Sequence, residues 1–508
     1  MSSQVSSRRR EKPLSALVGS IPGAKIEGNP EVVVGGIAYD SRSVEREWAF
    51  IAVRGQRYDG HDFLLDAVNR GASALIVEPG SSSPPPGVAV AVVPNTRAAM
   101  AVVARAFYDD PSSSLTLAGV TGTNGKSTTV LMLDALFRVA EKSSGVIGTL
   151  EYRIGERRLK AKHTTPEAID LQSLLAEMVD SGVTHAAMEV SSHALALHRV
   201  DGCRFDAAVF TNLTPEHLDF HADMEAYWHA KRQLFEDEQY LPQGRERVNA
   251  VNIDDEAGRE IARTALGRTL TYGLSVEAHY RAENVELRPD GTRFIAVYPA
   301  GKSPISMQLV GEFNVYNALG ALAAAIGLGI EPEVACRAIE EMAPIRGRFE
   351  RVPSKIRNVL VDYAHTPDSL RRALETARTI APGRVIVVFG CGGDRDRTKR
   401  PVMGEIASRL SDWCVVTSDN PRSEEPHDII EDIVGGIPED LKGKCEVEDD
   451  RAKAIRRAIE RATAADVVLI AGKGHEDYQI FADRTIHFDD REVAAEALKE
   501  IEKSVENA

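Results

Sequence analysis

The sequence predicts an α/β protein of three domains, with a mostly parallel central sheet built around a glycine-rich loop and a Rossmann-like, doubly wound C-terminal sheet. Residues 118–129 read AGVTGTNGKSTT, between an apolar run at 115–120 and apolar residues that recur at helical spacing. Short apolar runs alternate with helical patterns along most of the chain, which is typical of parallel sheets. Because 508 residues exceed what one hydrophobic core holds, we expect about three domains.

The first domain is predicted to cover residues 1–112 and to begin with a disordered tail at 1–13, which is rich in Ser and Arg. Apolar runs predict strands at 32–37, 49–53, 74–77 and 88–93, and helical patterns occupy 63–70 and 97–108. Residues 81–87, SSSPPPG, have the composition of a solvent-exposed loop. This segment is therefore predicted to be a small α/β unit.

The second and third domains are predicted at 113–345 and 346–508. In the second, apolar runs predict strands at 185–190 and 207–211, and an Ala-rich helix spans 316–328. Residues 343–348 are typical of a linker. In the third, strands predicted at 359–362, 385–390, 413–418 and 467–471 alternate with helices, which indicates a doubly wound parallel sheet. Sites in such sheets form at the carboxyl ends of the strands.

The composition narrows the classes of partner. A net charge of −15 argues against nucleic acid or an anionic membrane as the main partner, because phosphate backbones are bound by clustered Lys and Arg. The five cysteines are scattered without CxxC spacing, so we expect reduced thiols. No run approaches the roughly 18 apolar residues of a membrane span. We therefore expect a soluble cytoplasmic protein, in which anionic small substrates could bind only in locally basic pockets.

The glycine-rich loop has the chemistry of a phosphate-binding loop of the P-loop ATPase type. Gly122 and Gly125 let the backbone approach phosphates, Lys126 adds a positive charge, and Ser127 can hold Mg²⁺. ATP or GTP is the expected ligand. The strict G-x-x-x-x-G-K-[ST] pattern has Gly at position 120, where this chain has Val120. The alternative, a glycine turn with a surface lysine, is disfavoured by the strand and helix on either side.

Two further groups of polar residues follow predicted strands. Glu189 and His217 could ligate Mg²⁺ near the phosphate loop, although either one alone would more often be structural. Lys231, judged by its surroundings in the sequence, is typical of a solvated helix lysine. In the third domain, the loops at 390–396, 419–422 and 472–477 combine Gly with both charge signs. Arg binds carboxylates and acidic side chains bind ammonium groups, so these loops suit an amino acid with more than one head group.

These residues resemble the Mur ligase family, the ATP-dependent amide ligases of peptidoglycan precursor synthesis. The T-G-T-N-G-K-[ST]-T loop, without the first glycine, is that family's variant of the phosphate loop. Further matches are Asp40-Ser41-Arg42, Thr164-Thr165-Pro166, residues 189–193, Asn212-Leu213-Thr214, Ala230-Lys231, Asn314, Asn317, residues 348–350 and residues 362–365. The sequence DNPR at 419–422 is similar to that of the members that add meso-2,6-diaminopimelate, rather than L-lysine, to UDP-N-acetylmuramoyl-L-Ala-D-Glu.

The resemblance implies roles for particular residues. Those that would serve ATP are Gly122, Thr123, Asn124, Gly125, Lys126, Ser127, Thr128, Asn314, Arg348, Asp362 and His365. Mg²⁺ would be held by Ser127, Glu189, His217 and Lys231, the last as its CO₂ carbamate, N6-carboxylysine; Lys126, Glu189, His217 and Lys231 would be catalytic. The UDP-linked substrate would contact Ser41, Thr164, Thr165, Ser191 and Arg199, with Leu197 where some members carry a polar residue. Diaminopimelate would contact Arg395, Asp419, Asn420, Pro421, Arg422, Gly472 and Glu476.

The mechanism implied by the resemblance has two steps. Phosphate passes from ATP to the side-chain carboxylate of D-glutamate, and the diaminopimelate amine then attacks the acyl phosphate. The third domain must close over the second, so residues 343–347 are a predicted hinge. We also expect the protein to be a monomer. Two alternatives stay open: a folylpolyglutamate synthetase-like ligase, which would not need Asp40-Ser41-Arg42 or the 419–422 loop, and a nucleotide-dependent binding protein without catalysis. A motor-type ATPase is disfavoured, because no predicted strand after the loop ends in paired acids.

Overall fold

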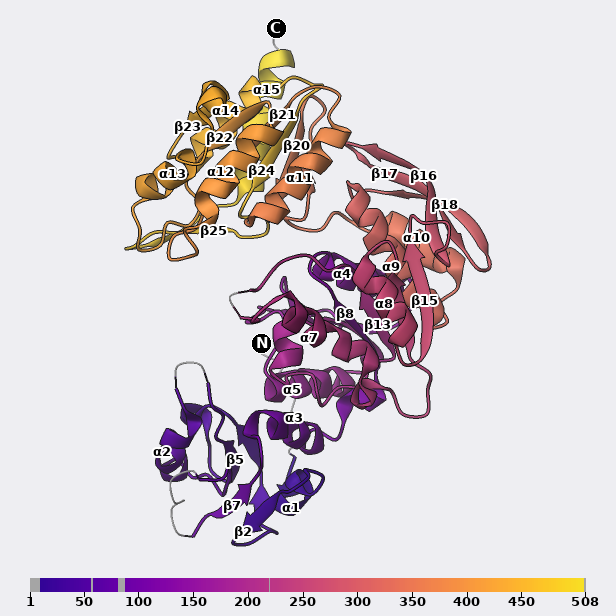
Figure 1. Cartoon of the computed structure of the whole chain (residues 1–508), viewed down its shortest axis with the longest axis vertical. Coiled ribbons are helices and arrows are strands. Elements are labelled where there is room, and N and C mark those ends of the chain that lie inside the picture. The colour runs from indigo at the N-terminus through magenta and orange to yellow at the C-terminus, as the bar shows by residue number, and fades with distance from the viewer. Residues whose placement is uncertain (1–9, 56–57, 81–86, 219, 507–508) are drawn as a thin grey trace. The chain divides into compact units, whose positions relative to one another are not determined.

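The computed structural model describes residues 10–55, 58–80, 87–218 and 220–506 (Figure 1). The contacts divide the chain into two compact units. The first comprises residues 1–281, 297–301 and 316–338, and the second comprises 282–296, 302–315 and 339–508. Among the described residues, no helix is both long and apolar enough to cross a bilayer.

The predicted disordered tail and the predicted solvent loop fall largely outside the described residues, at 1–9 and 81–86. For residues 10–13 the prediction of disorder is wrong. Lys12–Pro13 forms β1 and pairs antiparallel with β3 (Val33–Val34), and Arg10 Nη2 donates to Asp180 Oδ2 at 3.0 Å. The basic residues near this end therefore contribute to the fold, because acidic partners lie within reach.

The N-terminal domain is a five-stranded sheet in the order β2 (Lys25–Glu27), β7 (Ala89–Val92), β6 (Ala74–Val77), β5 (Trp48–Ile51) and β4 (Gly36–Ala38). The strand predicted at 32–37 is divided between β3 and β4, because β3 pairs with β1 and β4 with β5. Its helices are α1 (Leu14–Val18), α2 (Leu64–Asn69) and α3 (Thr96–Phe107), and α3 lies against α5 (Ala168–Asp180) of the central domain (Figure 1).

The central sheet has the strand order β11-β10-β9-β12-β8-β13-β14-β15-β16-β17-β18. Its strands are β8 (Thr116–Thr121), β9 (Ser144–Ile147), β10 (Tyr152–Ile154), β11 (Arg157–Leu159), β12 (His185–Glu189), β13 (Ala207–Phe210), β14 (Val248–Asn252), β15 (Arg268–Gly273), β16 (Tyr280–Arg288), β17 (Gly291–Tyr298) and β18 (Gly301–Met307). From β9 through β12, β8, β13, β14 and β15 to β16 every pairing is parallel. The predicted mostly parallel sheet is confirmed, and β8 lies inside it, directly before the glycine loop.

The helices of this part of the chain are α4 (Lys126–Val139), α5, α6 (Ser192–Ala196), α7 (Met224–Glu236), α8 (Glu256–Thr264), α9 (Glu312–Gly327) and α10 (Pro332–Glu341). The Ala-rich helix predicted at 316–328 is α9, which begins four residues earlier. Short 3₁₀ turns are η1 (Ser41–Ser43), η2 (Gly60–Phe63), η3 (Pro111–Ser114), η4 (Glu238–Tyr240) and η5 (Glu439–Lys444).

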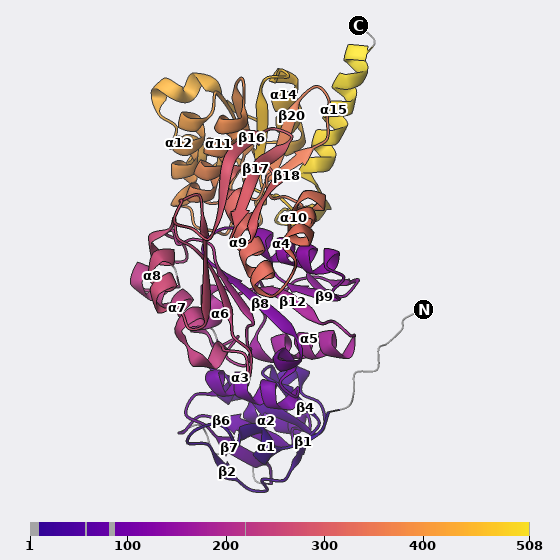
Figure 2. The ribbon, with the colours of Figure 1, turned by 90° about the vertical axis from the view of Figure 1, so that its right-hand side faces the viewer.

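The C-terminal domain is a six-stranded sheet in the order β19 (Glu350–Val352), β20 (Asn358–Asp362), β24 (Val467–Ala471), β21 (Val385–Phe389), β22 (Trp413–Val416) and β23 (Cys445–Val447). Its helices are α11 (Pro367–Ile380), α12 (Lys399–Leu410), α13 (Pro426–Val434), α14 (Arg451–Arg461) and α15 (Asp490–Glu506), with a β25 (Tyr478–Ile480) and β26 (Thr485–His487) hairpin. Val385, Val387 and Phe389 pack into one core, and Ile386 and Val388 pack into another. Figure 2 shows α11 and α12 on one side of the sheet and α14 and α15 on the other, so the doubly wound prediction is confirmed.

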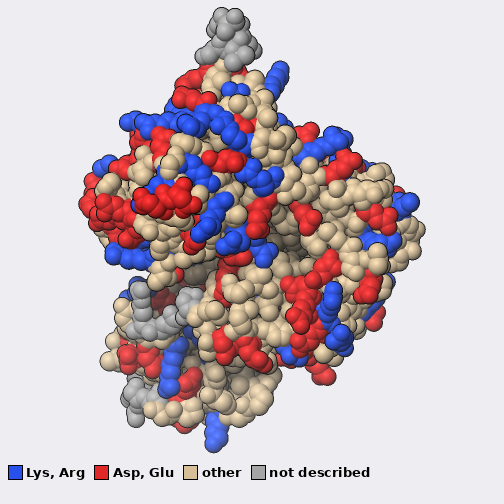
Figure 3. Space-filling model, turned by 45° about the horizontal axis from the view of Figure 1, so that its top comes forward, with Lys and Arg blue, Asp and Glu red and all other residues tan. Residues whose placement is uncertain are grey.

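Charged side chains of both signs are interspersed on the face shown in Figure 3. This pattern is the ordinary solvated surface of a protein with 27% charged residues.

Candidate active site

Residues around the glycine loop fix its conformation. Gly122 and Gly125 have φ of +144° and +87°, and a Cβ at Gly125 would overlap Oδ1 of Asn317. Asn212 accepts from the Asn124 N–H at 2.9 Å, and Lys126 Nζ donates to the carbonyls of Gly122 and Thr123 at 3.0 and 2.7 Å. The N-terminus of α4 follows directly, so the loop presents N–H groups and an ammonium to an anion.

A buried carboxylate lies beside this loop. Glu189, at the end of β12, is 2% exposed and accepts from Ser127 Oγ at 2.8 Å. Thr149 donates to the same carboxylate twice, from its N–H at 2.7 Å and from its hydroxyl at 3.3 Å. Carboxylate and hydroxyl oxygens are the hard ligands that Mg²⁺ prefers. Thr149 was not predicted from the sequence.

His217 lies in an aromatic group. Its backbone has φ of +60°, and its ring packs edge to face 4.7 Å from the ring of His193 and 6.2 Å from that of Tyr227. The part of the chain that the structure describes holds no group of three or more His, Cys, Asp or Glu arranged as a metal site. The structure therefore brings Ser127 and Glu189 together, while the full four-residue Mg²⁺ set stays a prediction.

Lys231 is buried, so the sequence-based interpretation of a solvated helix lysine is wrong. It is 1% exposed on α7, donates from Nζ to the Gly122 carbonyl at 2.8 Å, and lies 4.4 Å from the ring centre of Tyr227. Burial lowers the pKa of Lys231 well below its ordinary value, and the positive charge of Lys126 lowers this pKa further. A larger share of its amine is therefore neutral and nucleophilic.

A cavity of about 1330 Å³ lies between the N-terminal domain and α5 and α6. Ser41 and Arg199 line it, as do Arg42, Arg54 and Arg97, together with the carboxylates of Asp40, Asp66 and Glu167. Leu197 also lines it. Four arginines against three carboxylates leave the lining with a small excess of positive charge, which suits an anionic ligand, and the volume suits a ligand larger than most drug-sized molecules.

The other residues predicted for this ligand are linked to the cavity wall through Arg199. Its Nη1 donates to the Thr165 carbonyl at 3.1 Å, and its Nη2 pairs with Glu167 at 2.7 Å. Thr165 in turn donates to the Glu189 carbonyl at 2.8 Å and to Ser191 Oγ at 3.3 Å. Thr164 contacts the Thr149 hydroxyl at 3.0 Å. Arg199 and Thr165 thus join the cavity wall to the backbone of Glu189, whereas Thr164 reaches the Glu189 carboxylate through the Thr149 hydroxyl. Glu167 is a member of this network that sequence reasoning missed.

In the second unit, three of the residues predicted for ATP gather around Tyr363. The Arg348 guanidinium lies 5.2 Å from the Tyr363 ring centre, and the His365 ring nitrogen Nδ1 is 2.8 Å from the Tyr363 carbonyl oxygen. Asp362 accepts from the Phe349 N–H at 2.8 Å. Asn314, on α9, donates from Nδ2 to the Val310 carbonyl at 2.9 Å.

The loops at the carboxyl ends of β22 and β24 meet around Asn420. Its Nδ2 donates to Glu476 at 2.8 Å, and its Oδ1 accepts from the buried Lys473 ammonium at 3.1 Å. Burial raises the pKa of Glu476, and the nearby charge of Asp419 raises it further. Gly472, with φ of +118°, leaves room for Asp419, since a Cβ there would be 2.6 Å from Asp419 Oδ2. These groups supply acceptors and donors for an amino acid.

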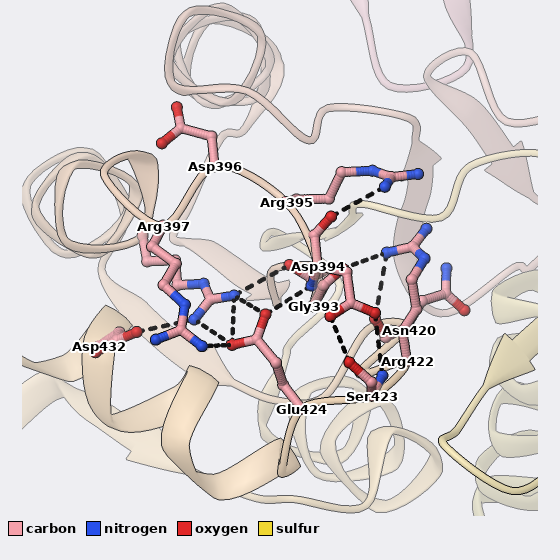
Figure 4. A network of polar contacts seen from close by, with 12 residues as sticks. Gly393, Asp394, Arg395, Asp396, Arg397, Asn420, Arg422, Ser423, Glu424 and Asp432 are labelled. Carbon is pink, nitrogen blue, oxygen red and sulfur yellow. Dashed lines mark hydrogen bonds and ion pairs between the residues drawn. The ribbon is translucent and has the colours of Figure 1, made fainter. Parts of the chain in front are cut away.

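Arg395 and Arg422 lie beside the turn at Gly393 and Asp394 (Figure 4). Arg422 Nη1 donates to the Gly393 carbonyl at 2.8 Å, and Arg395 Nη1 donates to the Asp394 carbonyl at 3.0 Å. Figure 4 shows both guanidinium groups on the same side of this turn. Pro421, between Asn420 and Arg422, is buried. Two cationic groups on one side of a turn suit a carboxylate ligand.

A carboxylate network fixes this turn. Glu424 accepts from the Asp394 N–H at 2.6 Å, from Arg397 at 2.7 Å and from Arg400 at 2.9 Å (Figure 4). The hydrogen bonds from Arg400 lower the pKa of Glu424 to about 2. The turn that carries Arg395 is therefore tied to the loop that carries Arg422.

Comparison with known proteins identifies the family. Family models match residues 33–108 (Mur ligase family, catalytic domain), 120–325 (Mur ligase middle domain) and 347–474 (Mur ligase, glutamate ligase domain). The chain belongs to the Mur ligase family. The resemblance inferred from the phosphate loop and the later motifs is thereby confirmed, as is the expected fold of three Mur ligase domains.

Two curated relatives of this Mur ligase carry the same name, UDP-N-acetylmuramoyl-L-alanyl-D-glutamate--2,6-diaminopimelate ligase. The protein from Caldanaerobacter subterraneus is 44% identical over 96% of this chain and 100% of its own. The protein from Gloeobacter violaceus is 47% identical over 92% of this chain and 94% of its own. A solved structure of a ligase with this name superposes with a TM-score of 0.72 at 32% identity, covering 96% of this chain and 99% of that one.

Proposed function

We propose that this Mur ligase adds meso-2,6-diaminopimelate to the D-glutamate of UDP-N-acetylmuramoyl-L-Ala-D-Glu, using ATP, in peptidoglycan precursor synthesis. The observation that carries the proposal is the set of three joined loops that bear Arg395, Arg422 and Glu476, in a chain 44% identical to a ligase named for that amino acid. Diaminopimelate has a distal carboxylate, which Arg422 would bind, whereas lysine has none. The cavity lined by Ser41 and Arg199 would hold the UDP-linked substrate.

The first step transfers the γ-phosphate of ATP to the side-chain carboxylate of D-glutamate. The glycine loop binds the phosphates through its N–H groups, and Lys126 neutralises the charge that develops on them. Ser127 and Glu189 fit Mg²⁺ as oxygen ligands and would hold it together with His217. When bound, the ion screens the charge of the phosphate oxygens.

Lys231 would contribute in carbamylated form. Its neutral amine adds to CO₂, forming an N–C bond and releasing one proton, and the resulting carbamate is an anion. Its oxygens would serve the same cation as Glu189. In the second step, the diaminopimelate amine attacks the acyl phosphate and phosphate leaves, so the chain's task is to align the two groups.

The test is phosphate release by the purified protein with ATP, Mg²⁺ and UDP-N-acetylmuramoyl-L-Ala-D-Glu, with meso-diaminopimelate or L-lysine as acceptor. Release should require diaminopimelate, with lysine at least roughly tenfold poorer because it leaves the arginine unpaired. Preference for lysine would overturn the assignment of the acceptor. No phosphate release with either acceptor would overturn the proposal and favour a folate-type substrate or a binding protein.

A further inference from the structure

A fully buried ion pair joins the first residues of two helices in the C-terminal domain. Arg451 opens α14 and Asp490 opens α15, and both side chains are inaccessible to solvent. The pair is bidentate, with Arg451 Nε 2.7 Å from Asp490 Oδ1 and Nη2 2.7 Å from Oδ2. Asp490 therefore fixes the plane of the guanidinium.

The same guanidinium also binds the ends of two strands. Nη1 donates to the Ser418 carbonyl at 3.3 Å, and Nη2 donates to the Ala471 carbonyl at 3.0 Å. These residues directly precede Asp419 and Gly472, where two of the candidate amino-acid loops begin. A Cβ at Gly472 would lie 2.6 Å from Asp419 Oδ2 and 3.8 Å from Arg451 Nη2. One side chain thus lies beneath the point where the two loops meet.

Stability alone is a poor explanation for this pair. Burying two charges costs desolvation, and replacing such a pair by apolar residues is often neutral or stabilising. The planar fork of Arg, in contrast, can bind a carboxylate and two carbonyls at fixed angles, which the single ammonium of Lys cannot. An arginine at this position therefore fixes the geometry of the two strand ends from which the loops start.

We propose that Arg451, oriented by Asp490, is a positioning residue that sets the spacing between the Asp419 loop and the Gly472 loop, and through it the affinity for the amino-acid substrate. This role rests on the proposed function. It predicts a selective defect: the site for diaminopimelate is disturbed, while the phosphate loop and the UDP-substrate cavity are built from other residues.

The experiment compares R451Q, R451K and D490N with the unaltered full-length protein in the phosphate-release assay. The KM for diaminopimelate should rise by about tenfold or more in R451Q and R451K, and less in D490N, because misplacement of binding groups by an ångström costs that much. The KM values for ATP and for the UDP-linked substrate should stay within about twofold. R384Q is the matched control, because Arg384 pairs with Asp466 at 2.8 Å beside the first residues of β21 and β24, at the opposite end of the sheet.

R384Q should lower the melting temperature without changing the KM for diaminopimelate. An unchanged KM in both R451Q and D490N, or an equal rise in R384Q, would overturn the positioning role. If R451Q does not fold, D490N is used in its place, because it preserves the shape of the side chain and one acceptor oxygen. A rise in its KM for diaminopimelate, with unchanged KM values for ATP and the UDP-linked substrate, supports the positioning role. Absence of diaminopimelate-dependent release by the unaltered protein would instead overturn the proposed function.

Discussion

Thr149 is the residue through which the loop after β9 holds the Glu189 carboxylate. Substitution of Thr149→Val removes the hydroxyl that donates to Glu189 and contacts Thr164, while the backbone N–H remains. Because partners that orient a metal ligand typically contribute 10-fold or more to affinity, the Mg²⁺ concentration for half-maximal phosphate release should rise by about tenfold. T149S keeps the hydroxyl and should match the unaltered protein. Equal Mg²⁺ dependence of the two variants would contradict this role.

Lys231 couples folding to pH. Since burial lowers its pKa in the folded state, the unfolded chain binds more protons at this residue between that pKa and the ordinary lysine value. Stability contributed at this position therefore rises with pH across that window. In CO₂-free buffer, K231M should have the higher melting temperature at pH 7, and the difference from the unaltered protein should shrink toward pH 10. Parallel pH profiles would contradict the burial of an uncharged amine.

Sequence patterns indicate the residues of contiguous motifs, but they do not show which distant residues contact one another. Lys126 and Ser127 could be assigned because loop and helix start are contiguous. Thr149 lies 40 residues from Glu189 and Arg451 lies 39 from Asp490, and no periodicity reports such pairs. Lys231, when judged only by the residues around it, was interpreted as solvated, because charged residues on helices are usually exposed.

At the scale of the loops, Gly472 fixes the shape of the proposed amino-acid site. G472A would place a Cβ 2.6 Å from Asp419 Oδ2 and would strain a backbone with φ of +118°. The KM for diaminopimelate should rise at least about tenfold. Gly155, at φ of +57° with nothing within 4 Å of its Cβ position, is the control. G155A should lose only some stability, of about 1–3 kcal/mol, from backbone strain. A similar KM in both variants would show that the close approach to Asp419 is unimportant.

Strands with continuous apolar runs were predicted well, because strands buried on both faces carry such runs. Val385–Phe389 and Val467–Ala471 are examples. In β16, half-buried residues alternate first with buried and then with exposed residues, and α10 is a short amphipathic helix. Both patterns are visible in the sequence but are weaker signals than a continuous run of apolar residues, so neither element was predicted.

For the whole molecule, the predicted hinge at 343–347 leads to a test by solution scattering. Arg346 pairs with Asp489 at 3.1 Å, and the Gly347 N–H donates to Glu350 at 2.7 Å, so the end of this linker is fixed within the second unit. Binding of ATP, Mg²⁺ and the UDP-linked substrate should reduce the radius of gyration, because the amine must reach the acyl phosphate. K126A, without the phosphate-binding ammonium, should show a smaller change, and an unchanged radius in the unaltered protein would contradict the hinge.

The division into two units has a consequence for how the chain can be cut. The chain passes between the units at 281–282, 296–297, 301–302, 315–316 and 338–339, so neither unit is a continuous stretch of sequence. A protein ended at residue 338 would keep β16, β17 and β18 without the 339–508 segment that completes their unit. Gene fragments that encode the halves separately should therefore yield insoluble or partly unfolded products, whereas a protease nick in one exposed loop should leave the fragments associated.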